Sequence, residues 1–119
     1  MSATITFDAK ELLDKLPINE NKRHNLIGMA KNAVERQRTW MNERPREGAN
    51  DQFFGTVGQS KLENIKSHLM EITQFLNALD NIETENPVIT MEVDFLSKSD
   101  IDEIYILLRR MFEDYGKAL

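Results

Sequence analysis

The fold of this chain is decided by the stretch LENIKSHLMEITQFLNAL, which spans residues 62–79. Its apolar residues recur at alternating spacings of three and four, as they do along one face of a helix. They are Leu62, Ile65, Leu69, Ile72, Leu76 and Leu79. A stripe of this length has to be covered by other helices, so we expect the core to form around one helix over residues 60–81.

The same spacing returns near the C-terminus, in a second stripe. It consists of Ile101, Ile104, Leu108, Met111 and Tyr115. This pattern predicts a helix over residues 97–115 whose stripe packs against the first. Ser97 with Asp100, and Ser60 with Glu63, have the spacing of capping boxes, which would fix where the two helices begin.

The C-terminal helix is also apolar outside its stripe, at Tyr105, Leu107 and Phe112. Such breadth indicates burial on two sides of the helix. Either the rest of the chain wraps around it, or these three residues form an interface with another chain. The sequence leaves both interpretations open.

The remaining elements are shorter. Ile5 and Phe7 alternate with threonines, and four apolar residues alternate with polar ones over residues 89–95, so each segment predicts a strand. Two isolated strands need each other or a second chain. Pro17 and Pro45 end two helices, predicted to start at Asp8 and Asn19. The predicted fold is mainly α, a three- to four-helix bundle with a short two-stranded β element in the order β-α-α-α-β-α, in one domain over residues 1–119.

The helix predicted from Asn19 to about Arg44 has a thin apolar face. Gly28 is expected to let a neighbouring helix come close, and the second half, which carries Arg36 and Arg38, is expected to face solvent. A loop with three glycines follows at about residues 45–59.

Composition places the chain among globular proteins, with 40% hydrophobic and 29% charged residues. No apolar run approaches the roughly 18 residues that cross a bilayer. The absence of cysteine excludes disulfides, and the first residues lack the pattern of a signal peptide. We therefore expect a cytoplasmic protein that does not use a membrane.

The net charge of −5 is unevenly distributed. Residues 20–47 carry seven Lys/Arg against four Glu, whereas residues 80–103 carry eight acids against one lysine. Such asymmetry can steer a charged partner, or the two regions can neutralise each other. An acidic chain disfavours general affinity for nucleic acid.

One candidate ligand site lies where the basic helix meets the glycine loop. Its predicted residues are Arg36, Arg44, Arg46, Phe53, Phe54 and Lys61. Together with backbone amides near Gly55 and Gly58, they could surround a nucleotide or another phosphorylated compound. The alternative is a solvated helix face, with the two phenylalanines packed against the bundle.

Catalytic and metal-binding patterns are weak. His24 stands in a polar run, and His68 is expected to be a surface imidazole near a carboxylate. Acidic residues gather at Asp94, Asp100, Asp102 and Glu103, but without the spacing of a calcium loop, and acids in a first helical turn are favoured by the helix dipole alone. We predict no catalytic residue, no metal and no cofactor.

Three functional hypotheses follow. The leading one is a non-enzymatic interaction protein that binds a protein partner or copies of itself through the C-terminal helix and an exposed strand. Inhibitors, immunity proteins and accessory subunits of phages or bacteria are of this kind. The alternatives are a binder of a phosphorylated small molecule and a structural subunit of a virion or larger assembly; an enzyme is not expected.

Overall fold

The computed structural model describes residues 2–82, 85–94 and 97–117. Its elements are, in order, β1 (Ser2–Asp8), α1 (Lys10–Leu13), α2 (Glu20–Glu43), the 3₁₀ turn η1 (Phe54–Thr56), α3 (Gln59–Ile65), the 3₁₀ turn η2 (Lys66–His68), α4 (Leu69–Asp80), β2 (Val88–Asp94) and α5 (Lys98–Gly116). The predicted mainly α fold with a two-stranded β element is confirmed. Within the described ranges, no helix is both long and apolar enough to cross a bilayer.

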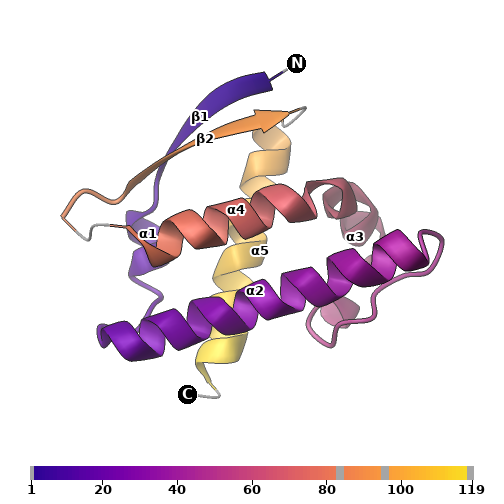
Figure 1. Cartoon of the computed structure of the whole chain (residues 1–119), viewed down its shortest axis with the longest axis horizontal. Coiled ribbons are helices and arrows are strands. Elements are labelled where there is room, and N and C mark those ends of the chain that lie inside the picture. The colour runs from indigo at the N-terminus through magenta and orange to yellow at the C-terminus, as the bar shows by residue number, and fades with distance from the viewer. Residues whose placement is uncertain (1, 83–84, 95–96, 118–119) are drawn as a thin grey trace.

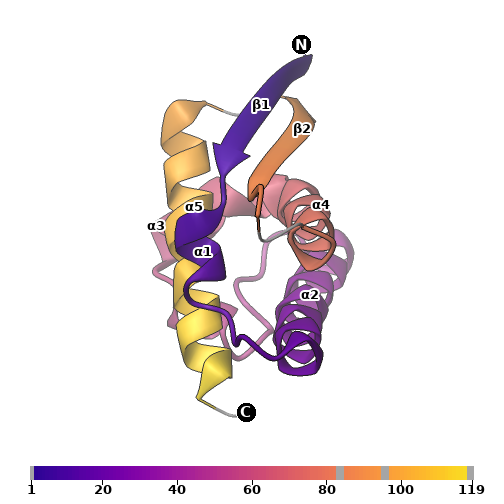
Figure 2. The ribbon, with the colours of Figure 1, turned by 90° about the vertical axis from the view of Figure 1, so that its left-hand side faces the viewer.

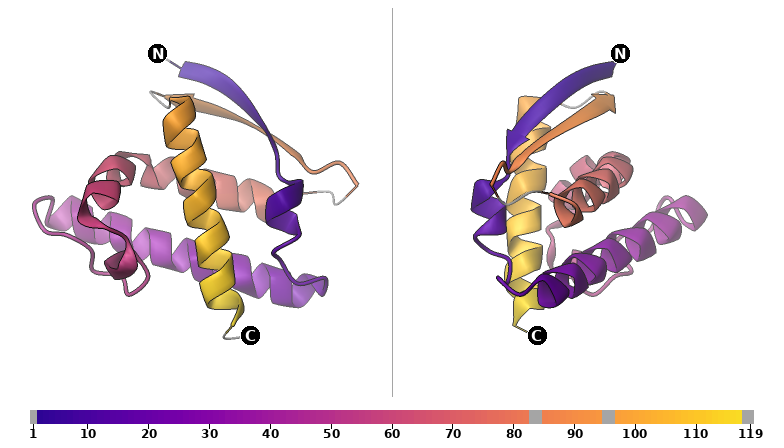
Figure 3. Two further views of the ribbon diagram at one scale, coloured as in Figure 1. Left: turned by 180° about the vertical axis from the view of Figure 1, so that it is seen from behind. Right: turned by 60° about the vertical axis from the view of Figure 1, so that its left-hand side comes forward.

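The helices form two layers. Helices α2 and α4 lie side by side, and α5 crosses behind them (Figure 1). Viewed from the side, α1 and α5 make the second layer, and the β ribbon closes one end (Figure 2). The reverse view shows α5 running from the ribbon to the far side of α2 (Figure 3).

The predicted middle stripe lies in the core, since all six of its residues are buried in one cluster. Its prediction as one continuous helix is wrong, because the turn η2 separates α3 from α4 and the chain changes direction there. Helix α4 lies along α2, and α5 crosses that pair instead of running beside α4. A three-four spacing continues across the turn, so the periodicity alone does not reveal the break.

Helix α2 differs from the expectation in two ways. A Cβ at Gly28 would meet nothing within 4 Å, so no helix approaches closely there. The second half is not simply solvated, because Val34 and Gln37 are buried. The glycine loop folds back onto this half of the helix, where Gln37 and Trp40 form hydrogen bonds with the loop backbone.

The two strands pair with each other, as expected. They form an antiparallel ladder that runs from Ser2 opposite Asp94 to Asp8 opposite Val88. One face packs on the helices, where the rings of Phe7 and Phe75 meet edge to face with centroids 5.1 Å apart. Phe95, expected in the second strand, lies outside the described residues.

The capping box at the start of α5 is confirmed. The Ser97 hydroxyl accepts a hydrogen bond from the Asp100 backbone N–H, and the Ser97 N–H donates to Asp100 Oδ2, at 3.1 and 3.0 Å. The pKa of Asp100 lies below its usual value of 3.8. The hydrogen bond from the Ser97 backbone contributes most to this shift, followed by the bond from the Ser97 hydroxyl, and the nearby His68 lowers the pKa further. The predicted box at Ser60 is wrong, because α3 begins after Gly58 without a side-chain cap.

We expect Ser97→Ala to lower the free energy of unfolding by about 1 kcal/mol at pH 7. Because folding depresses the pKa of Asp100, its share of this stability is present above pH 3.8 and is lost as the pH falls through the folded-state value. Urea unfolding at pH 7 and at about pH 3 should therefore show a smaller cost in acid. Ser99→Ala, at an exposed position of the same turn, is the control. An equal cost at both pH values would contradict this account.

Candidate protein-interaction site

The predicted ligand residue Arg36 is engaged within the chain. Its Nε and an Nη donate hydrogen bonds to Asp51 Oδ2 at 3.0 and 2.9 Å. The other oxygen of Asp51 accepts from the backbone N–H groups of Phe53 and Phe54, at 2.8 and 3.4 Å. Asp51 is 5% exposed, so this ion pair fastens the glycine loop to α2.

Gln37 and Trp40 complete this fastening. Gln37 Oε1 accepts from the backbone N–H groups of Asn50 and Asp51, at 3.0 and 3.2 Å. The Trp40 indole N–H donates to the Gly48 carbonyl at 3.0 Å. The loop amides that α2 uses are thus those of Asn50 and Asp51. Of the amides that the sequence offered to a phosphate, that of Gly55 donates within the loop, to the Asp51 carbonyl at 2.9 Å.

The other predicted ligand residues do not converge on one site. Phe53 and Phe54 are buried, with ring centroids 5.5 Å apart. Arg44 lies over the Trp40 ring at 4.5 Å, and the neighbouring Arg46 is exposed. Lys61 lines a different hollow, on the side of α5. For the two phenylalanines the structure matches the alternative, in which they pack against the bundle.

The predicted interface on α5 needs correction. Leu107 and Phe112 are 7% and 1% exposed, so the chain itself covers them and they are not available to a partner. Tyr105 is half-buried and donates a hydrogen bond to Glu11 Oε2 at 3.3 Å. Because the rest of the chain buries Leu107 and Phe112, α5 is apolar on more than one stripe.

Each of the two histidines lies near an aspartate. His24 is paired through Nδ1 with Asp80, at 2.8 Å. The expectation of a surface His68 is wrong, because this residue is 9% exposed, with Nε2 3.8 Å from Asp100 Oδ2. Among the described residues, no group of three or more His, Asp and Glu side chains could hold a metal ion.

The outer edge of β1 is the clearest unpaired feature of the fold. Beyond β1, Ala9 donates its N–H to the Pro87 carbonyl at 2.7 Å, which marks a hydrogen-bonded pair in the ladder. Since such pairs alternate in an antiparallel ladder, the backbone groups of Thr4 and Thr6 point away from β2. They face no other strand in the described ranges, so this edge offers N–H and C=O groups to an incoming strand.

Apolar side chains flank this edge on the face that meets the helices. Ile5 and Phe7 are half-buried, whereas Ile89 and Val93 on β2 are 4% and 3% exposed. Ile101 of α5 is half-buried too and lines the same narrow crevice beneath the ribbon as Ile5. Ile5 and Phe7 therefore leave apolar surface uncovered on the β1 side of this face, while on β2 Met91 is half-buried and Val88, at the end of the strand, is 46% exposed.

The two edges of the ribbon also differ in charge. Strand β1 carries one charged residue, Asp8, at its end, whereas β2 carries Glu92 and Asp94. In natural proteins, charged residues, prolines or bulges on an edge strand prevent it from pairing with another chain. The first six residues of β1 contain none of these. The alternating threonines indicated the strand in the sequence. Which of its two edges stays open is decided by the pairing with β2, which only the structure shows.

Comparisons with known proteins give no relative, since no family model, no curated protein and no solved structure matches this chain.

Proposed function

We propose that this chain is a non-enzymatic interaction protein that assembles with a second copy of itself through the outer edge of β1. The observation that supports this is a seven-residue, nearly uncharged strand whose outward backbone groups have no strand to pair with in the described residues. Strand addition to such an edge is a common mode of protein recognition.

The pairing follows from the sequence of the strand. An antiparallel arrangement about a twofold axis at Ile5 places each Thr4 opposite the partner's Thr6 and each Ser2 opposite the partner's Asp8. The acids then lie at opposite ends of the new ladder, and a four-stranded sheet results. The second copy covers Ile5 and Phe7, which the monomer leaves half-buried.

The β2 edge is a poorer choice for self-pairing. Two copies joined there about Met91 would place four acids, Glu92 and Asp94 of each chain, in one short ladder, against two at β1, and each Glu92 would lie diagonal to the partner's Glu92. Twofold pairing at β1 closes the assembly as a dimer. We propose a cytoplasmic role of the inhibitor, immunity-protein or accessory-subunit type; the virion-subunit alternative would need the β2 edge as well and stays a prediction.

The test is the oligomeric state of a matched pair of proline variants. Thr6→Pro removes an outward N–H from β1 without removing a bond of the internal ladder, and Thr90→Pro does the same on β2. Both variants also lose the same contact, that between the two threonine hydroxyls at 3.3 Å. We expect sedimentation velocity to show a dimer whose dissociation constant rises about 100-fold in Thr6→Pro. Thr90→Pro should leave the dimer intact.

Two results would contradict the proposal. One is a wild-type chain that stays monomeric at millimolar concentration. The other is equal weakening of the dimer by both variants while their circular dichroism remains that of the wild type, because the interface would then not involve β1 specifically.

A further inference from the structure

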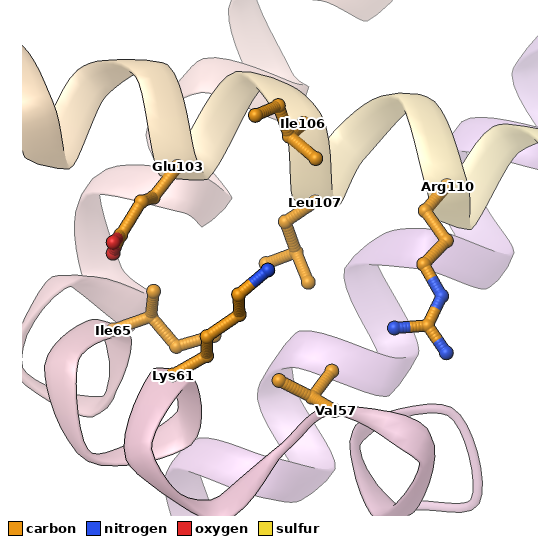
Figure 4. Close-up of a pocket in the computed structure, with 7 residues that line it drawn as sticks. All are labelled: Val57, Lys61, Ile65, Glu103, Ile106, Leu107 and Arg110. Atoms are coloured by element: carbon orange, nitrogen blue, oxygen red, sulfur yellow. The ribbon is translucent and has the colours of Figure 1, made fainter.

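A second surface feature, separate from the β1 edge, lies between α3 and α5 (Figure 4). It is a groove of about 110 Å³ whose floor is formed by Val57, Ile65 and Leu107. Side chains reach across it from both helices: Lys61 extends from α3 toward α5, and Arg110 descends from α5 toward Val57.

The groove has an apolar lip that faces water. Ile106 is 59% exposed, although the three floor residues are each at most 9% exposed. Another side of α5 faces β1 and α1: Ile101 lies in the crevice beside Ile5, and Tyr105 bonds to Glu11. A partner copy at β1 would therefore leave this groove open.

The two cations of the groove, Arg110 and Lys61, differ in their contacts within the chain. Arg110 donates hydrogen bonds to the carbonyl and hydroxyl oxygens of Thr56, at 3.2 and 2.5 Å, and its guanidinium lies 5.4 Å from the centre of the Phe53 ring. These contacts fix its position at one end of the groove. Lys61 has no ion-pair partner in the part of the chain that the structure describes.

The acid of the groove lies at the opposite end. Glu103 and Arg110 both come from α5, seven residues apart, with Lys61 between them (Figure 4). The half of the groove between Lys61 and Arg110 is therefore positive, in a chain whose net charge is −5. An apolar floor beside two cations complements a group that combines an aliphatic side chain with a carboxylate.

We propose that this groove binds a peptide segment of a partner protein in which one aliphatic side chain stands next to a carboxylate. The aliphatic side chain fills the floor between Ile65 and Leu107, and the carboxylate pairs with Lys61 and Arg110. The volume of about 110 Å³ fits one side chain, whereas pockets that hold drug-sized ligands measure about 300–1,000 Å³. The groove is thus the size of a pocket for a single anchoring side chain of a peptide.

The test uses N-acetyl-leucine as the probe, because it carries both groups. We expect NMR titration of the wild-type chain to shift the amide signals of residues that line the groove, with a dissociation constant in the millimolar range typical of so small a ligand. N-acetyl-leucinamide, which lacks the charge, and N-acetyl-alanine, which lacks the aliphatic bulk, should each bind at least about fivefold more weakly.

Three charge variants locate the site. Lys61→Gln and Arg110→Gln should each weaken N-acetyl-leucine binding about fivefold. Lys66→Gln, which removes a positive charge from the adjoining turn η2, is the matched control and should leave binding unchanged. Lys61 has no ion-pair partner among the described residues, so its variant remains informative if Arg110→Gln proves unstable.

Absence of shifts at these residues would overturn the proposal. So would equal binding of N-acetyl-leucine and its amide, or an equal effect of Lys61→Gln and Lys66→Gln. None of these results depends on dimerisation, so the proposal for the β1 edge is tested separately.

Discussion

Asp51→Ala is expected to lower the free energy of unfolding by about 3 kcal/mol. The carboxylate joins Arg36 to the backbone N–H groups of Phe53 and Phe54, and it is 5% exposed. Its removal leaves buried N–H groups without an acceptor, and each such group costs about 1–3 kcal/mol. The loop would also lose its attachment to α2.

Denaturant unfolding followed by circular dichroism measures this cost. Glu47→Ala is the control, because Glu47 is an exposed loop acid whose ion pair with Arg44, at 3.5 Å, lies at the surface. Its effect should stay within about 0.5 kcal/mol. A change of less than about 1 kcal/mol in Asp51→Ala would mean that Asp51 does not fasten the loop.

Arg36→Ala separates the two roles of Asp51. Arg36 is more than half exposed, so its loss leaves one buried group, the Asp51 carboxylate, without its ion-pair partner. The double variant should lose less stability than the sum of the single variants, because both remove the same ion pair. This coupling distinguishes an ion pair that fastens the loop within the chain from two residues that are free to bind a ligand.

Phe112→Ala should be the most damaging single change, at about 3–5 kcal/mol. Phe112 is 1% exposed and belongs to the core shared by α2, α4 and α5. Truncation removes a large apolar side chain and leaves a cavity that the surrounding helices cannot fill. The melting temperature should fall by roughly 10–20 °C.

Ile106→Ala is the control on the same helix, since its side chain is 59% exposed. Its stability should change by less than about 0.5 kcal/mol in differential scanning calorimetry. If Phe112→Ala instead kept its melting temperature and altered only the oligomeric state, α5 would present Phe112 to a partner and the assignment of this residue to the core would be wrong.

The candidate sites were only partly accessible to prediction. The sequence indicated the β1 strand and its partner, and it drew attention to Lys61, but it grouped Lys61 with Arg36, which lies on another side of the molecule. Spacing along a chain reports which residues share a helix face. It does not report which residues from separate elements meet, because that depends on how the helices cross.

The sequence by itself determined the strands and the helical segments, apart from the break between α3 and α4, and the burial of most of the apolar stripes. The reason is that the periods of helix and strand are local and each stripe must leave water. Only the tertiary structure decided which apolar residues of α5 are covered by the chain and which charged residues are paired within it. The crossing of α5 behind α2 and α4 buries Leu107 and Phe112, and the return of the loop gives Arg36 an internal partner. These outcomes depend on contacts between residues far apart in the chain, which no local pattern encodes.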